Sequence, residues 1–239
     1  MTTRSLRRAA LLAGLFAAAA VAPAAESLPE SASQKTMKAD VEFLQKGLGK
    51  TPQKREIPTL KAAAMLLALN AQESKGAYRE QALKVADSVA KKDFAGAKTA
   101  ADAFADAKDA PGEPKPLVTL AKFELAEVMS CFRASTVGGM NLEKDIKAYG
   151  KKLGDPAQAE VVAGRVALIA VYTKQLPPAE AAGEAKKKQW DEWSDEMGTI
   201  ARQIATDAGK GASADKPALE KQFVKLNANC NACHTAFRN

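Results

Sequence analysis

Residues 219–237 read LEKQFVKLNANCNACHTAF, and apolar or thiol side chains recur in this stretch every three or four positions. These side chains are Leu219, Phe223, Leu226, Cys230, Cys233 and Phe237. Such spacing places all of them on one face of a helix. The stretch therefore predicts an amphipathic helix that packs one side against a core.

The composition of the whole chain also favours helices. Hydrophobic residues make up 46% of the 239 residues and charged residues 26%, as in ordinary globular proteins, whereas aromatic residues make up only 5%. Val, Ile and Thr do not gather in alternating runs, which would indicate strands. We therefore expect an all-α protein.

An internal repeat divides the chain into two halves. Two segments that start 105 residues apart each carry apolar residues at steps of 4, 3 and 4. The apolar positions are Met37, Val41, Leu44 and Leu48 in the first segment and Leu142, Ile146, Tyr149 and Leu153 in the second. A chance pseudo-repeat in an alanine-rich helical chain is the alternative to a duplication.

The helices that follow each repeat segment also match. Thr51-Pro52 and Asp155-Pro156 each place a capping residue before a proline, and apolar helices follow at 60–71 and 161–173. A helical region at 83–104 is interrupted near Asp93. The matching helix of the second half has five apolar side chains on one face: Trp190, Trp193, Met197, Ile200 and Ile204. Loops are expected at 111–116 and 209–217 before the fourth helix of each half.

The repeat predicts two tandem four-helix bundles. Short loops between amphipathic helices favour antiparallel packing of this kind. We place the first bundle at 33–134 and the second at 141–239, with the joint at 135–139.

The strongest chemical signal is Cys230-Asn-Ala-Cys233-His234, the spacing of a c-type haem attachment site. Both thiols lie on one helix face, so they can form thioethers with one haem, and His234 can bind its iron. One covalent haem c is therefore predicted, in the C-terminal bundle.

Three other chemical roles for the thiols are considered in turn: a redox site, a disulfide and a zinc site. A redox Cys-x-x-Cys site normally opens a helix in a βαβ setting, which this chain lacks. A disulfide between Cys230 and Cys233 suits an exported protein. Zinc could bind Cys131, Cys230, Cys233 and His234, but adjacent helix residues such as Cys233 and His234 point in different directions.

The last predicted helix resembles that of the class II c-type cytochromes, the cytochrome c′ family, in its haem motif and in the Phe237-Arg238 that follows. The resemblance implies a periplasmic haem protein used in electron transfer or in binding small gases, with Arg238 near a haem propionate. It also implies that Trp193 occupies a position where the family often has tryptophan. The first half ends Met129-Ser-Cys131-Phe-Arg133, without the second thiol and the histidine, so it is expected to be a haemless duplicate.

The sixth iron position is predicted to be open. His234 is the only histidine, so a second histidine ligand within the chain is excluded. In the resembled family the residue over the open haem face comes from the first helix of the haem bundle, which here offers Leu142, Ile146 and Tyr149, with Met140 just before it. A five-coordinate iron with a crowded apolar face is expected.

Residues 1–24 resemble a signal peptide. Arg4, Arg7 and Arg8 precede an apolar stretch at 9–21 that is too short to span a membrane, and small residues follow at 22–24. Export to the periplasm is therefore expected, with no membrane span after the signal is removed. The net charge of +7 would fall to +4, a mild excess that favours an acidic redox partner.

The haem motif, the signal-like segment and the single histidine together favour some functions over others. The chain is expected to be a periplasmic electron carrier, with binding of NO or CO as the alternative. An enzyme ranks last because the only histidine is used as an iron ligand. Aromatic residues do not interleave with the basic ones, so nucleic acid is not expected as a partner. The sequence leaves a homo-oligomer open.

Overall fold

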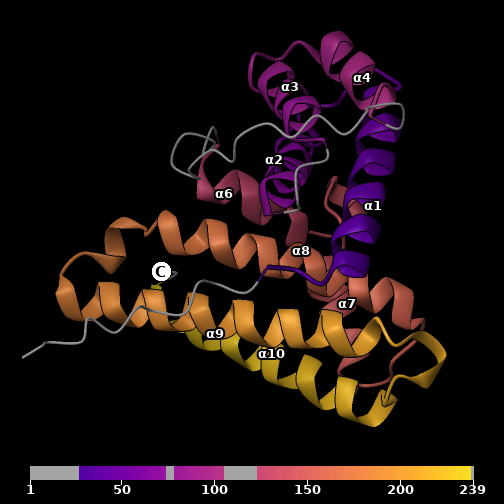
Figure 1. The fold of residues 1–239 in the computed structure, drawn as a ribbon. Helices are drawn as coiled ribbons and strands as arrows, with labels where there is room; N and C mark the ends of the chain where they lie inside the picture. The colour runs from indigo at the N-terminus through magenta and orange to yellow at the C-terminus, as the bar shows by residue number, and fades with distance from the viewer. Residues whose placement is uncertain (1–26, 74–77, 105–122, 238–239) are drawn as a thin grey trace, which may run out of the picture.

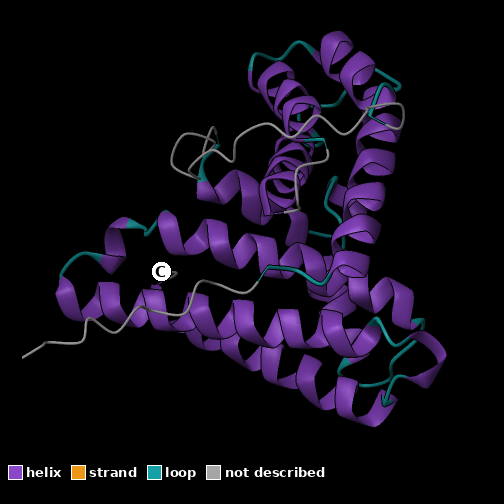
Figure 2. Cartoon of the chain, in the orientation of Figure 1, coloured by secondary structure: helices purple, strands orange, loops and turns teal. Residues whose placement is uncertain are grey.

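The computed structural model describes residues 27–73, 78–104 and 123–237 (Figure 1). Within these ranges every regular element is helical and no strand occurs (Figure 2). The all-α prediction is therefore confirmed. The predicted signal peptide at 1–24, the predicted loop at 111–116 and Arg238 lie outside the described residues.

The first half contains one long pair of helices and several short ones. They are α1 (Glu30–Leu48), α2 (Ile57–Glu73), α3 (Arg79–Ala90), α4 (Phe94–Asp102), α6 (Leu125–Val128) and the 3-10 helix η1 (Met129–Phe132). Helix α1 packs on α2 and α4, and α2 packs on α3 and α6. The predicted break near Asp93 is confirmed, because Asp93 ends the turn after α3 and accepts a 2.9 Å hydrogen bond from the Gly96 N–H of α4.

The predicted start of α2 at Thr51-Pro52 is wrong. The helix begins at Ile57, after a turn in which the Gln53 N–H donates to the Glu56 carboxylate at 2.8 Å. A helix that began at Pro52 would have to continue through Pro58, whose ring would clash with the carbonyl four residues earlier. Starting at Ile57 instead places Pro58 in the first turn, where its missing N–H costs nothing.

The second half forms a longer bundle. Its elements are η2 (Ser135–Val137), α7 (Leu142–Tyr149), α8 (Pro156–Gln175), η3 (Ala179–Ala181), α9 (Glu184–Ala208), η4 (Gly211–Ser213) and α10 (Lys216–Phe237). Helices α8 and α9 form an antiparallel hairpin, α10 packs on α9, and α7 packs on α10 (Figure 1). The predicted cap of α8 is confirmed, because the Asp155 carboxylate accepts a 2.9 Å hydrogen bond from the Ala157 N–H.

The two halves meet where α1 crosses α8. A Cβ added to Gly164 would lie 2.3 Å from the Thr36 hydroxyl oxygen, so a larger residue here would force the Thr36 side chain to move. Two ion pairs join the same helices: Arg165 Nε lies 2.7 Å from Asp40 Oδ1, and Lys35 Nζ lies 2.5 Å from Glu160 Oε2. Both carboxylates are fully buried, and one apolar core runs through both halves.

The joint between the halves is held by backbone hydrogen bonds. The Met140 N–H donates to the Cys131 carbonyl at 3.0 Å, and the Asn141 N–H donates to the Arg133 carbonyl at 2.8 Å. The predicted boundaries at 33–134 and 141–239, and the duplication itself, stay predictions.

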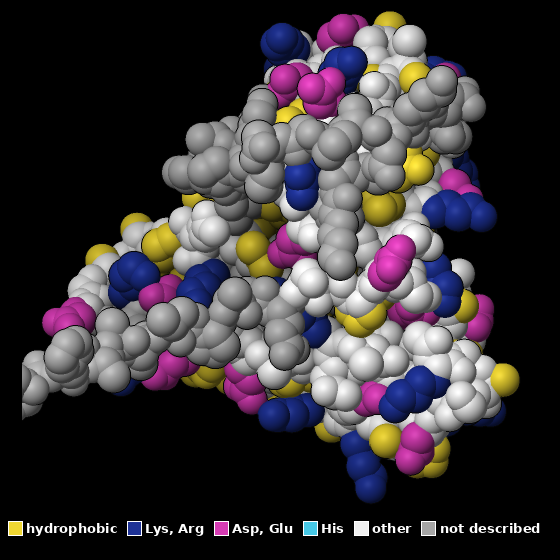
Figure 3. Space-filling model, in the orientation of Figure 1, with side chains coloured by type: hydrophobic (Ala, Val, Ile, Leu, Met, Phe, Trp, Pro, Cys, Tyr) yellow, Lys and Arg dark blue, Asp and Glu magenta, His cyan; other side chains and the backbone are white. Residues whose placement is uncertain are grey.

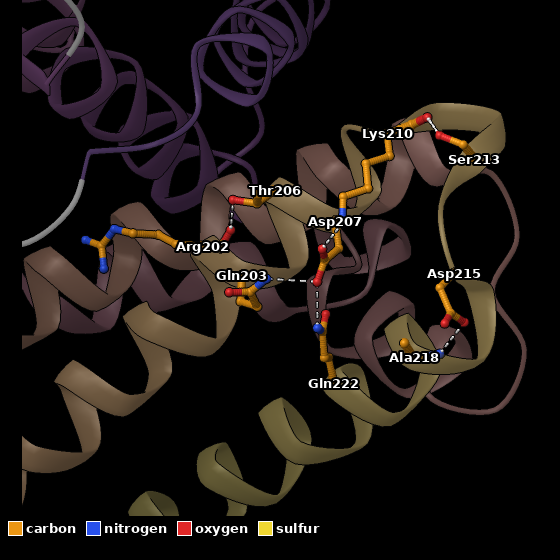
Figure 4. A network of polar contacts seen from close by, with 9 residues as sticks. All are labelled: Arg202, Gln203, Thr206, Asp207, Lys210, Ser213, Asp215, Ala218 and Gln222. Carbon is orange, nitrogen blue, oxygen red and sulfur yellow. Dashed lines mark hydrogen bonds and ion pairs between the residues drawn. The ribbon is translucent and has the colours of Figure 1, made fainter.

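A polar network joins α9 to α10 at one end of the second half (Figure 4). The Asp207 carboxylate lies 2.6 Å from Lys210 Nζ and accepts hydrogen bonds from Gln203 at 2.9 Å and Gln222 at 2.8 Å. Asp215 accepts a 3.0 Å bond from the Ala218 N–H and so caps the first turn of α10. These contacts fix the register in which α10 returns along α9.

Candidate haem-binding site

The two thiols of the predicted motif lie on the buried side of α10. Leu219, Phe223 and Leu226 are fully buried, and Cys230 and Cys233 continue the same face as half-buried side chains. Both are free thiols, so the disulfide reading is not supported. Burial raises the pKa of Cys230 to about 11 and also raises the pKa of Cys233, so both thiols are protonated at neutral pH.

His234 follows on the next position of the helix and is exposed. One covalent haem needs two thiols one helical turn apart and one adjacent imidazole. The side chains present on α10 match that set in type, spacing and thiol state. They therefore fit a c-type haem.

The zinc reading finds no support in the described residues. Cys131 is fully buried in η1, where burial raises its pKa to about 12. Across residues 27–73, 78–104 and 123–237, no group of three or more His, Cys, Asp and Glu side chains gathers as metal ligands would. Cys131 is thus part of the core rather than of the site.

Three aromatic rings lie beside Cys233, and we call them the aromatic cluster: Trp190, Trp193 and Phe237. The Phe237 ring meets Trp190 edge-on at 5.2 Å and Trp193 at 5.6 Å between centroids. Cys233 packs against this cluster, and so do Ala181 and Leu125. The Trp190 indole N–H donates to the Thr173 carbonyl of α8 at 2.9 Å. The cluster therefore gives the thiol an apolar neighbour from α9.

Asn229 fixes the motif against α9. It is buried on α10 immediately before Cys230, and its amide donates to Glu196 at 3.0 Å and to the Trp193 carbonyl at 3.4 Å. These bonds tie the thiol-bearing turn to the turn that carries Trp193. Sequence reasoning missed Asn229, although its position three residues after Leu226 on a buried face signals a polar group that needs a partner.

Helix α7 covers α10 from the other side. Leu142 and Ile146 are buried, and the Tyr149 ring lies 5.2 Å from the Phe223 ring. The burial predicted for this face is confirmed. Met140 is also buried, and its backbone N–H donates to the Cys131 carbonyl at 3.0 Å.

The remaining surface carries charges of both signs. Lys and Arg side chains are interspersed with Asp and Glu on the face drawn in Figure 3. In the part of the chain that the structure describes, no helix combines the length and apolar character needed to cross a membrane.

Comparison with known proteins gives a match for the second half of the chain. A search of curated proteins and of solved structures gave no match to the chain. A family model described as Cytochrome C′ matches residues 132–238. The matched range contains α7 to α10, the Cys230 and Cys233 thiols and the exposed His234. Residues 132–238, a little under half of the chain, are therefore similar to the cytochrome c′ family.

Proposed function

We propose that this chain is an exported monohaem c-type cytochrome that carries single electrons in the periplasm. The observation that carries the proposal is the pair of free, half-buried thiols, Cys230 and Cys233, one helical turn apart and next to His234, the only histidine. The family match over 132–238 supports the same reading. The export step rests on the signal-like residues 1–24.

Each residue has a defined task. The Cys230 and Cys233 thiols would hold haem through two thioether bonds, each made by adding S–H across one vinyl group, so that no oxidant would be needed. His234 would bind the iron through an imidazole nitrogen. When bound, haem supplies an iron that gains and loses one electron. The aromatic cluster and the buried face of α10 keep water away from one side of the site.

An electron carrier needs only a redox group near the surface and a partner protein. The exposure of His234 and the half-burial of Cys233 support a site of that kind. An enzyme is not proposed, because the only histidine is assigned to the iron. We also propose that a partner protein exchanges electrons with the haem.

The proposal is tested by mass spectrometry of the full chain made in a host with haem-ligation machinery. The expected mass is that of the processed polypeptide plus one haem. Cys230→Ala should leave one thioether or none and so reduce the haem that survives denaturation, whereas Cys131→Ala should leave attachment unchanged. A wild-type mass equal to the bare polypeptide would contradict the proposal.

A second function, binding of NO or CO at a five-coordinate iron, is supported by a specific observation. Leu142 and Ile146, the buried side chains of α7, have no atom that can bind iron, and Met140 is fixed at its backbone. The reduced protein should then change its visible spectrum when carbon monoxide is added. An unchanged spectrum, with a methionine–iron charge-transfer band that Met140→Ala removes, would establish a dedicated electron carrier instead.

A further inference from the structure

The aromatic cluster beside Cys233 receives one side chain from outside the cytochrome c′ region. Leu125 packs on the buried group of Ala181, Trp190 and Phe237, against which Cys233 also packs. Leu125 belongs to α6 of the first half, and the family match begins only at residue 132. The haemless half therefore contacts the same rings as the thiol of the motif.

The segment that carries Leu125 is held firmly from both sides. Tyr172 of α8 is fully buried, and its hydroxyl donates a hydrogen bond to the Phe123 carbonyl. On the other side, Lys61 of α2 lies 2.6 Å from Glu127 Oε1. The segment at 123–127 thus bridges the helices α2 and α8.

Leu125 also borders a cleft. A cavity of about 540 Å³ lies between the start of α6 and the chain that leaves α8, and Phe123, Leu125 and the Leu176-Pro177-Pro178 run line it. One side chain, Leu125, both lines this cleft and packs on the aromatic cluster. Shortening that side chain would extend the cleft towards the rings that shield Cys233.

We propose that the haemless half is a working part of the haem site: Leu125, positioned by the Tyr172–Phe123 hydrogen bond, closes the aromatic cluster against water and so sets the reduction potential of the haem. This inference rests on the proposed function. Solvent exposure and dielectric around a haem are among the properties by which a protein tunes its potential. Leu125 is a positioning residue, because it acts through the rings.

The test compares Leu125→Ala with Leu83→Ala in the full-length holoprotein. Leu83 is also a half-buried leucine of the first half, but it packs on the main core from α3, away from the aromatic cluster. We expect Leu125→Ala to lower the midpoint potential, because water stabilises the more positive ferric state, and Leu83→Ala to leave it unchanged. Tyr172→Phe, which keeps the ring and removes only the hydroxyl, should shift the potential in the same direction.

Tryptophan emission gives a readout that does not require haem. The chain has only two tryptophans, and both belong to the aromatic cluster. In the haem-free Cys230→Ala/Cys233→Ala chain, Leu125→Ala should shift the emission to longer wavelength and Leu83→Ala should not. If circular dichroism shows that Leu125→Ala does not fold, Tyr172→Phe is compared with Leu83→Ala instead.

The outcomes separate this inference from the proposed function. A wild-type chain without haem overturns the proposed function, and the tuning role falls with it. A wild-type chain that carries haem, with Leu125→Ala and Tyr172→Phe matching Leu83→Ala in potential, overturns the tuning role and leaves the function standing. A shift in the tryptophan emission of Leu125→Ala without a change in its midpoint potential would also overturn the tuning role.

Discussion

At the scale of single residues, spacing along the chain predicts which side chains share one face of a helix, and the haem site itself stays a prediction. Cys230, Cys233 and His234 lie within five consecutive residues, so their relation depends only on helix geometry. Asn229 and Tyr172 could not be placed in the same way, because their partners lie 33–49 residues away in sequence. Local periodicity shows that a side chain is buried but does not identify what it contacts.

Asp207 is the residue whose charge state we expect to matter most for the haem bundle. Burial alone would raise its pKa, but hydrogen bonds from Lys210, Gln203 and Gln222 and the Lys210 charge outweigh burial and lower the pKa to about 2. A carboxyl with a lowered pKa in the folded state stabilises the fold above its ordinary pKa of about 3.9. That stabilisation is lost as the pH falls from about 4 towards about 2.

We therefore expect Asp207→Asn to lower the free energy of unfolding by about 1–2 kcal/mol at neutral pH. The difference from wild type should shrink as the pH falls through this window, because protonation then removes the Asp207 charge from the wild-type protein and the Asn variant lacks that charge at every pH. Urea titrations of both proteins at neutral and acidic pH measure this difference in the free energy of unfolding. Asp102→Asn, which breaks an exposed pair with Lys98, is the control and should change stability by less than about 0.5 kcal/mol. An equal loss at both pH values would contradict the prediction.

At the scale of elements, capping residues and prolines decided which predicted boundaries were correct. The Asp155 cap and the break at Asp93 were confirmed because each carboxylate meets a backbone N–H within its own turn. The start of α2 was wrong because Pro58 was left out of the argument. Residues 125–132, where the fourth helix of the first half was expected to end, form only the short helix α6 and the 3-10 helix η1.

In the turn before α7, Gly138 has a φ of +87°. A Cβ at this position would lie 2.8 Å from the Arg55 carbonyl oxygen, so an L-residue would meet both backbone strain and a clash. Gly211 also has a positive φ of +61°, but a Cβ there would meet no atom within 4 Å. Substitution at Gly211 would therefore cost backbone strain alone, whereas substitution at Gly138 would cost the same strain and the clash as well.

We expect Gly211→Ala to lower the free energy of unfolding by about 1 kcal/mol, the cost of a left-handed conformation for an L-residue. Gly138→Ala should cost more, since the joint between η1 and α7 must also shift. Chemical denaturation of both variants beside wild type measures the two losses. Equal losses would show that the joint tolerates the extra carbon.

At the scale of the whole molecule, the sequence predicted two helical halves but could not predict how they pack. The repeat identified which face of each helix is buried, since the periodicity is local. The pairs that join the halves, Asp40 with Arg165 and Lys35 with Glu160, are each 125 residues apart. No pattern within one half distinguishes these charges from ordinary surface charges, so the interface was missed.

The Asp40–Arg165 pair should therefore be the most sensitive contact between the halves. Asp40 is fully buried, Arg165 is 11% exposed, and burial raises the pKa of Asp40 although Arg165 opposes it. Arg165→Met leaves a buried carboxylate without its cation, a loss that costs roughly 3–5 kcal/mol in buried pairs. Because one core runs through both halves, the helical signal and the tryptophan emission should fall together in a single, earlier transition.

The control for this prediction is Lys98→Met, which breaks a surface pair in α4 and should cost less than about 0.5 kcal/mol. The double variant Asp40→Leu/Arg165→Met removes both charges and should recover much of the lost stability, because no unpaired charge remains in the interface. Helical circular dichroism follows both halves, whereas both tryptophans lie in α9 of the second half and their emission follows that helix and its contacts. If the emission transition of Arg165→Met stayed at the wild-type denaturant concentration while part of the helical signal was lost earlier, the halves would fold independently.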